Sequence, residues 1–284
     1  MYLHYFNLKE EPFSMTPDPR FFYLSRQHEG AIEAFLYGIE QRKGFLLLTG
    51  EIGTGKTTLC RELINRLDDK TEISVIFNPL LSVAGLLQAI NRDFGNPVQG
   101  ETEEVQLDGL NRFLLEGLKK GRNAIVLIDE AQNLSVEALE MTRLLSNLET
   151  DKQKLLQIIL VGQPELEMTL RKDSLRQLNQ RIHIREHLRP LHFNEMQEYI
   201  FHRLLLAGGE GRVHFLPNAL RKVFRWTKGT PRLINIVCDR ALLAAYASRK
   251  TVIDKQLATV AIRDVSGKAG QPWWQFWRRI PVSL

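Results

Sequence analysis

Short runs of large apolar residues recur along the first two thirds of the chain, separated by segments whose apolar residues are spaced as on one face of a helix. Such runs predict strands that are buried on both faces. The predicted strands cover residues 45–48, 73–77, 123–128, 155–161 and 181–188, and the first predicted helices cover 25–42, 58–67, 82–94 and 102–120. Because buried strands that alternate with helices form a parallel sheet covered on both faces, we expect an α/β fold with a parallel five-stranded sheet.

From Pro190 onward the pattern becomes entirely helical. The predicted helices there cover 194–207, 217–226, 231–248 and 254–264, and a capping box of Asn194 and Gln197 is expected to begin the first of them. We therefore expect three parts. They are an α/β domain at 1–189 with an aromatic-rich N-terminal extension packed on it, a small all-helical lid domain at 190–264, and a C-terminal tail at 265–284.

One loop matches the phosphate-binding pattern G-x-x-x-x-G-K-[ST] at every fixed position and lies between a predicted strand and a predicted helix. Its glycines allow positive φ angles, so that backbone N–H groups turn toward phosphates at a helix start that favours negative charge. We predict that Lys56 contacts the β- and γ-phosphates and that Thr57 binds Mg²⁺. The predicted nucleotide-binding residues are Gly50, Glu51, Ile52, Gly53, Thr54, Gly55, Lys56, Thr57 and Thr58.

Two carboxylates, Asp129 and Glu130, end the buried run at residues 123–128. Ligands of parallel α/β sheets bind at the carboxyl ends of the strands, so these acids are expected beside the phosphates. Asp129 is then predicted to hold Mg²⁺, and Glu130 to orient and deprotonate the attacking water. With the phosphate-binding loop, the pair predicts an ATPase with ATP and Mg²⁺ as cofactors.

Three further candidates remain open between function and structure. Gln163 follows the strand at 155–161 and is either a polar contact to the γ-phosphate or water, or a turn residue before the helix that Pro164 begins. Leu24 and His28 either flank the adenine or make ordinary core contacts.

A basic run from Arg171 to Arg189 is either a solvated face or the source of an arginine that reaches a neighbouring subunit. Within it, His183 and His187 match the spacing H-x-x-E-H of zinc proteases. In a strand the two histidines share a face but Glu186 points to the other face, so we expect solvent-facing histidines and no metal.

Composition narrows the class of protein only slightly. The chain has 44% hydrophobic and 25% charged residues and a net charge of +5, which is ordinary for a globular protein. Cys60 and Cys238 both lie in apolar helical segments, which favours buried thiols in a reducing compartment. With no signal peptide or membrane-spanning run expected, the prediction is a cytoplasmic protein.

Taken together, the motifs resemble the AAA+ ATPases, and more narrowly the secretion ATPase family of general secretion pathway protein A (ExeA), closest to its short MSHA pilus biogenesis (MshM) type. The resemblance covers residues 1 to about 264. It rests on the segments Pro17-Asp18-Pro19-Arg20-Phe21, Gly50 to Thr58, Asp129-Glu130-Ala131-Gln132-Asn133-Leu134, Gly162-Gln163-Pro164-Glu165-Leu166 and Gly229-Thr230-Pro231-Arg232-Leu233-Ile234-Asn235.

The resemblance implies an ATPase that helps to assemble or position a type II secretion or type IV pilus machine at the bacterial inner membrane. It implies that Gln163 is sensor 1, that Arg232 is sensor 2, and that the arginine finger is Arg181 or, failing that, Arg176. It also implies a homo-oligomer, a hexamer among the candidates, and a pilus or secretion component of the inner membrane as partner.

The tail favours the short pilus type and suggests peripheral contact with the membrane. Secretion-type members continue into a membrane span and a periplasmic domain, whereas this sequence ends at Leu284, after a segment with three of its four tryptophans beside Arg278 and Arg279. A strap folded back on the lid domain is the alternative for that segment. For the whole chain the alternatives are a DNA-associated regulator of the transposition or replication-initiation type, although nucleic acid is not expected as a partner, and a nucleotide-dependent scaffold that barely hydrolyses.

Overall fold

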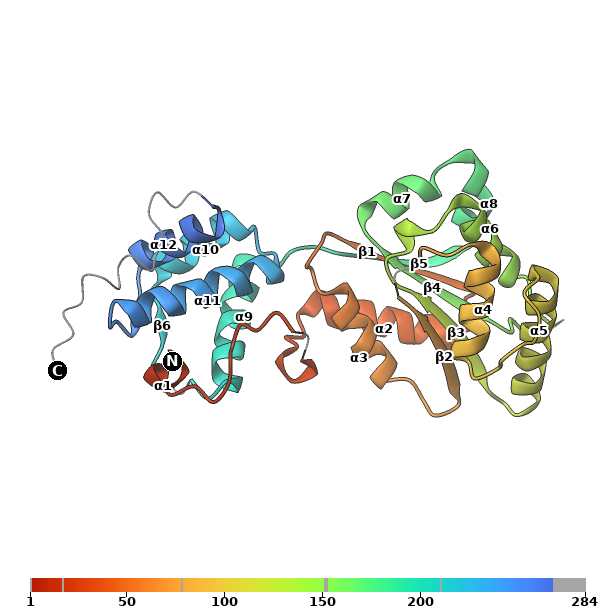
Figure 1. The fold of residues 1–284 in the computed structure, drawn as a ribbon, viewed down its shortest axis with the longest axis horizontal. Helices are drawn as coiled ribbons and strands as arrows, with labels where there is room; N and C mark the ends of the chain where they lie inside the picture. Colours follow the sequence, from red (N-terminus) through yellow and green to blue (C-terminus); the bar gives the residue numbers. More distant parts are fainter. Residues whose placement is uncertain (1, 17, 78, 151–152, 210, 268–284) are drawn as a thin grey trace. The chain divides into compact units, whose positions relative to one another are not determined.

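Two compact units, each with its own hydrophobic core, make up the protein in a computed structural model (Figure 1). The structure describes residues 2–16, 18–77, 79–150, 153–209 and 211–267. The α/β unit comprises residues 26–189. The helical unit combines the residues up to Ser25 with those from Pro190 onward.

The α/β unit is built on a parallel five-stranded sheet, as the sequence predicts. Its strands are β1 (Phe45–Gly50), β2 (Thr71–Ile76), β3 (Asn123–Ile128), β4 (Gln157–Gly162) and β5 (Ile182–Leu188), in the order β2-β3-β4-β1-β5. The central strands β1 and β4 are buried along their whole length, which is why they appear in the sequence as unbroken apolar runs. The register pairs Thr49 with Gly162 and Ile128 with Leu160, so the loops after β1, β3 and β4 leave the sheet at one edge.

Helices cover both faces of this sheet (Figure 1). One face carries α2 (Arg26–Glu40) and α3 (Lys56–Asn65); Gly38 of α2 lies directly on the side chains of Leu46 and Ile184. The opposite face carries α4 (Val83–Asp93), α5 (Glu103–Lys119), α6 (Val136–Leu145), α7 (Pro164–Leu170) and α8 (Arg176–Gln180). The helix α6 was not predicted from the sequence, although Ser135 caps it by accepting a hydrogen bond from the N–H of Ala138 at 3.2 Å.

The helical unit contains α1 (Tyr2–Phe6), α9 (Phe193–Leu206), α10 (Pro217–Thr227), α11 (Pro231–Ala247) and α12 (Lys255–Val265), with a two-stranded parallel ladder of β6 (His214–Phe215) and β7 (Val252–Ile253). Asp254 caps α12, accepting from the N–H of Leu257 at 2.9 Å. The predicted capping box of Asn194 and Gln197 is wrong. The helix starts at Phe193, His192 is its N-cap, and Glu195 accepts from the N–H of His192 at 2.9 Å. This cap lies one turn before Met196, which is buried in the core.

The N-terminal aromatic segment belongs to the helical unit rather than to the α/β domain, so its predicted packing is corrected. Phe6, Phe13 and Phe21 are buried in the core of the helical unit. The same core contains buried residues of α9 and α11.

A buried arginine fastens the same segment. Arg203 of α9 is 7% exposed and donates from Nε to the carbonyl oxygen of Pro12 at 2.5 Å and from Nη2 to that of Ser14 at 3.4 Å. Its Nη1 donates to the hydroxyl of Tyr199 at 2.9 Å, and the guanidinium lies 5.0 Å from the ring centroid of Phe21. Arg203 therefore joins Pro12, Ser14 and Phe21 to α9.

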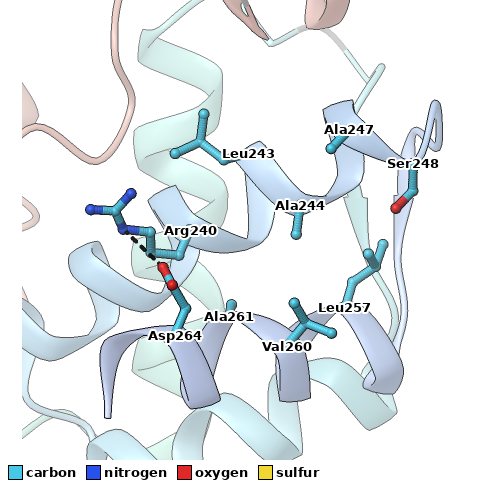
Figure 2. A pocket seen from close by; sticks show the side chains of 9 residues that line it. All are labelled: Arg240, Leu243, Ala244, Ala247, Ser248, Leu257, Val260, Ala261 and Asp264. Atoms are coloured by element: carbon cyan, nitrogen blue, oxygen red, sulfur yellow. Dashed lines mark ion pairs between the residues drawn. The ribbon is translucent and has the colours of Figure 1, made fainter. Parts of the chain in front are cut away.

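An apolar groove runs between α11 and α12 (Figure 2). Leu243, Ala244 and Val260 contribute apolar side chains to it, and the ion pair of Arg240 with Asp264, 3.6 Å long, lies at one end. None of the predicted site residues lines this groove. The described chain ends at Gly267, so the tryptophan-rich tail lies outside the described residues.

Each unit holds one buried cysteine. Cys60 lies on α3 and Cys238 on α11, and burial raises the pKa of both thiols. No helix in the described part of the chain combines the length and the apolar character needed to cross a bilayer.

Candidate active site

The phosphate-binding loop lies between β1 and α3 with the backbone that its glycines allow. Gly53 and Gly55 have φ angles of 80° and 105°, in the left-handed region that a side chain disfavours. Thr54 fixes the turn by donating from its hydroxyl to the carbonyl of Glu51 at 2.8 Å. Gly55 ends the loop, and α3 begins at Lys56 without a capping hydrogen bond from a side chain at its N-cap position. The first N–H groups of the helix and its dipole fit a phosphate group.

Lys56 is folded into this loop. Its Nζ donates to the carbonyl oxygens of Gly50 at 2.7 Å and Glu51 at 3.1 Å, and the residue is only 6% exposed. Burial lowers the pKa of this ammonium, and the nearby carboxylates of Glu130 and Asp129 oppose the shift. A desolvated cation beside the backbone N–H groups of the loop and of the first turn of α3 is suited to bind the phosphates of a nucleotide.

The hydroxyl of Thr57 meets the carboxylate of Asp129. Thr57 Oγ1 donates to Asp129 Oδ2 at 2.8 Å, and Asp129 Oδ1 accepts from the N–H of Glu130 at 2.9 Å. Asp129 is 3% exposed and its own N–H donates to the carbonyl of Ile76 at 2.9 Å, which anchors the acid to β2. A hydroxyl and a single carboxylate fit Mg²⁺, which in phosphate-binding sites takes few protein ligands and keeps water and phosphate oxygens as the rest.

Glu130 is held by two glutamines. Its backbone is left-handed, with φ of 54° and ψ of 37°. Its Oε2 accepts from Gln132 Nε2 at 2.5 Å and from Gln163 Nε2 at 3.3 Å. The N–H of Gln163 donates in turn to Gln132 Oε1 at 3.0 Å. Gln163 is the residue before α7, and its amide lies at the predicted base. Its contact with the γ-phosphate or the water stays a prediction.

Gln132 is the site residue that the sequence analysis missed. It lies in the short 3₁₀ turn Ala131–Asn133 that follows Glu130. Room for its amide comes from Gly162, where an added Cβ would lie 2.7 Å from Gln132 Oε1. The signal in the sequence was a glutamine two residues after the acid pair, together with a glycine at the end of a neighbouring strand. This pattern could have indicated Gln132 as a site residue.

The predicted finger residues lie elsewhere in the α/β unit. Arg181 stands just before β5, at the amino ends of the strands, and donates to Ser146 Oγ at 3.0 Å and to Asn147 Oδ1. It is therefore remote from the phosphate-binding loop of its own chain, which lies at the carboxyl ends. Arg176 on α8 is exposed and makes no side-chain hydrogen bond or ion pair with any described residue.

The remaining candidates divide between the two units. Arg232 is exposed on the first turn of α11 in the helical unit, which also contains Leu24. His28 is buried on α2, with Nε2 3.2 Å from the position of a Cβ at Gly55, so it lies beneath the loop. His183 and His187 are both exposed, as expected, and His187 Nδ1 in addition lies 2.9 Å from the hydroxyl of Thr49.

A phosphate-binding loop after β1, an acid pair after β3 and a separate helical unit define an AAA+ P-loop fold. Comparison with known proteins agrees: residues 39–170 match the family described as AAA domain. The chain is 44% identical over 276 residues to General secretion pathway protein A of Aeromonas hydrophila, across 97% of this chain and 50% of that protein. The chain is thus similar to AAA domains and to this relative, and it spans about half the length of the curated relative.

Solved structures show the same fold. The ORC2 protein of Aeropyrum pernix in its ADPNP and ADP complexes matches with a TM-score of 0.68 at 18% identity, over 90% of this chain and 72% of that chain. Cdc6p of Pyrobaculum aerophilum matches with a TM-score of 0.69 at 17% identity, over 92% of this chain and 74% of that chain. At this level of identity the likeness concerns the fold alone.

Proposed function

We propose that the protein hydrolyses ATP with Mg²⁺ and that turnover drives the assembly or positioning of a type II secretion machine or an MSHA-like type IV pilus at the bacterial inner membrane. The observation that carries the ATPase proposal is the hydrogen bond of Thr57 to Asp129, with Glu130 next in the chain and Lys56 close by. The secretion or pilus role rests on the kinship with General secretion pathway protein A.

In this proposal the residues divide the work by position. Lys56 and the N–H groups of the loop bind the β- and γ-phosphates, while Thr57 and Asp129 hold Mg²⁺, which would supply charge neutralisation at the phosphates. Glu130 accepts a proton from the attacking water. The oxygen of this water bonds to the γ-phosphorus while the bond from that phosphorus to the oxygen that bridges to the β-phosphate breaks. Gln163 lies beside this base as sensor 1.

The oligomer, Arg232 as sensor 2 and an arginine finger supplied by Arg181 or Arg176 are part of the same proposal. So are a cytoplasmic location and peripheral contact with the inner membrane through the tail around Trp273 and Trp277, which lies outside the described residues. ATPase activity that rises on DNA and falls steeply with salt would instead favour the DNA-associated alternative.

Two substitutions test the ATPase proposal. Glu130→Gln is nearly isosteric and leaves Asp129 in place, so it should bind ATP with unchanged affinity while turnover falls by roughly 10²-fold or more. Lys56→Ala removes the cation in the loop and should weaken ATP binding itself. Release of phosphate and equilibrium binding of a fluorescent ATP analogue measure the two effects. Turnover near the parental rate in Glu130→Gln would remove Glu130 from its assigned role.

A further inference from the structure

The amide of Gln132 has a fixed orientation between two partners. Its Oε1 accepts from the backbone N–H of Gln163, which can only donate, so its Nε2 must face the carboxylate of Glu130. The bond from Nε2 to Glu130 Oε2, at 2.5 Å, is far shorter than the 3.3 Å contact from Gln163 Nε2 to the same oxygen. Gln132 is therefore the principal hydrogen-bond donor to the predicted base.

The two oxygens of Glu130 are consequently not equivalent. Oε2 carries both amide contacts, whereas Oε1 has no hydrogen-bond partner among the described residues. The backbone of Glu130 is fixed separately, because its N–H donates to Asp129 Oδ1 at 2.9 Å. Asp129 thus sets the backbone and Gln132 sets the side chain.

We infer that Gln132 is a positioning residue for the hydrolysis proposed above: it holds Oε2 of Glu130 so that Oε1 accepts the proton of the attacking water. This inference rests on the proposed function. It also joins the base to the end of β4, because the second bond of the Gln132 amide goes to the backbone of Gln163, the residue before α7. A carboxylate that is anchored at one oxygen loses the rotations that would carry the other oxygen away from the water.

Gly162 supports the arrangement. A Cβ at this residue would stand 2.7 Å from Gln132 Oε1 and 2.9 Å from Leu166 Cδ2, so any side chain would displace the bridging amide or α7. The glycine therefore makes room for the amide at the end of β4.

The test compares Gln132→Met with the parental chain. Methionine keeps the length of the side chain but donates and accepts no strong hydrogen bond. We expect kcat to fall about tenfold or more while KM and the Kd for ATP stay within twofold, since only the orientation of the base is lost. Gln177→Met on the exposed surface of α8 is the matched control and should leave kcat unchanged. The nearly isosteric Gln132→Glu should show the same loss and serves if the methionine variant does not fold.

A double-mutant cycle separates positioning from general damage. In the Glu130→Gln background, single-turnover measurements should show no further loss on adding Gln132→Met, because Gln132 acts only through Glu130. Parental kcat in Gln132→Met, or an equal additional loss in the Glu130→Gln background, would overturn the inference. If Gln132→Met is normal while Glu130→Gln is inactive, the inference fails and the proposed ATPase stands. If the parental chain releases no phosphate from ATP, the proposed function fails and this inference with it.

Discussion

At the scale of single residues, Lys56 combines two requirements that conflict. A loop that binds phosphate calls for a cation, but this cation is buried among carbonyl oxygens. Its pKa is lowered mainly by that burial. The loop therefore carries an unfavourable charge that an anion would relieve.

This conflict predicts a dependence of stability on pH. Below the lowered pKa of folded Lys56, the cost of burying the ammonium is fully present. As pH rises through that value toward the ordinary lysine pKa of about 10.4, the unfolded chain binds more protons than the folded chain, so stability increases relative to a variant without the amine. Melting temperatures of the parental chain and of Lys56→Met, measured from pH 7 to pH 10 without nucleotide, should diverge in favour of the parental chain. Parallel curves would contradict the buried charge.

At the scale of elements, the sequence predicts helices and strands best where one or both faces of the element are buried by neighbouring elements of the same unit. The runs that became β1, β3 and β4 are buried by neighbours on both sides, and the loop at Gly50–Thr57 has a fixed pattern. The position of the N-terminal segment was mispredicted because Phe6, Phe13 and Phe21 indicate only that they need partners, not which unit provides them. Gln132 was missed because its role depends on Gly162 and Gln163, which come from another strand and its following loop.

The attachment of that segment gives a prediction about Arg203. Arg203→Met leaves the carbonyls of Pro12 and Ser14 and the hydroxyl of Tyr199 without their cationic donor, so the helical unit should lose about 3 kcal/mol. Arg240→Met, which removes a half-exposed ion pair of 3.6 Å, is the control and should cost less than about 1 kcal/mol. Urea unfolding, monitored by the rate of proteolytic cleavage within residues 9–22, measures the stability loss of both variants. Equal effects of the two variants would show that Arg203 does not anchor the segment.

At the scale of the whole molecule, the position of Arg181 has a consequence for assembly. It lies at the amino ends of the strands, and Ser146 and Asn147 hold its guanidinium. If Arg181 is the finger proposed above, it would serve the nucleotide of a neighbouring chain, and one chain alone would be incomplete.

Mixing of variants tests this arrangement. Arg181→Ala should hydrolyse ATP roughly 10³-fold more slowly than the parental chain, and mixing it with Lys56→Ala should restore part of the activity, because some interfaces then combine an intact loop with an intact arginine. The same mixture made with Arg176→Ala shows which arginine acts. If neither mixture recovers activity although all variants fold and associate, hydrolysis does not depend on an arginine supplied by a neighbour.

The two cysteines allow the effect of nucleotide on each unit to be measured separately. A thiol reagent should label Cys60 and Cys238 only when the unit around each opens, because both are buried. ATP should slow labelling of Cys60, which lies one turn into the helix after the loop. If Arg232 acts as sensor 2, ATP should slow labelling of Cys238 as well, and Arg232→Ala should abolish that second effect alone. Protection of Cys238 that survives this substitution would show that Arg232 does not carry the signal.

Because each unit contains one buried thiol, the labelling rates of Cys60 and Cys238 report separately on the opening of the two units. Mass spectrometry can read the two labelling times from the same sample, in a cell extract as well as in a cuvette, without any dye or engineered residue. Unfolding of either half, capture of nucleotide and docking onto a larger machine would each leave its own pair of times. The two labelling times thus show which of the two units stayed closed.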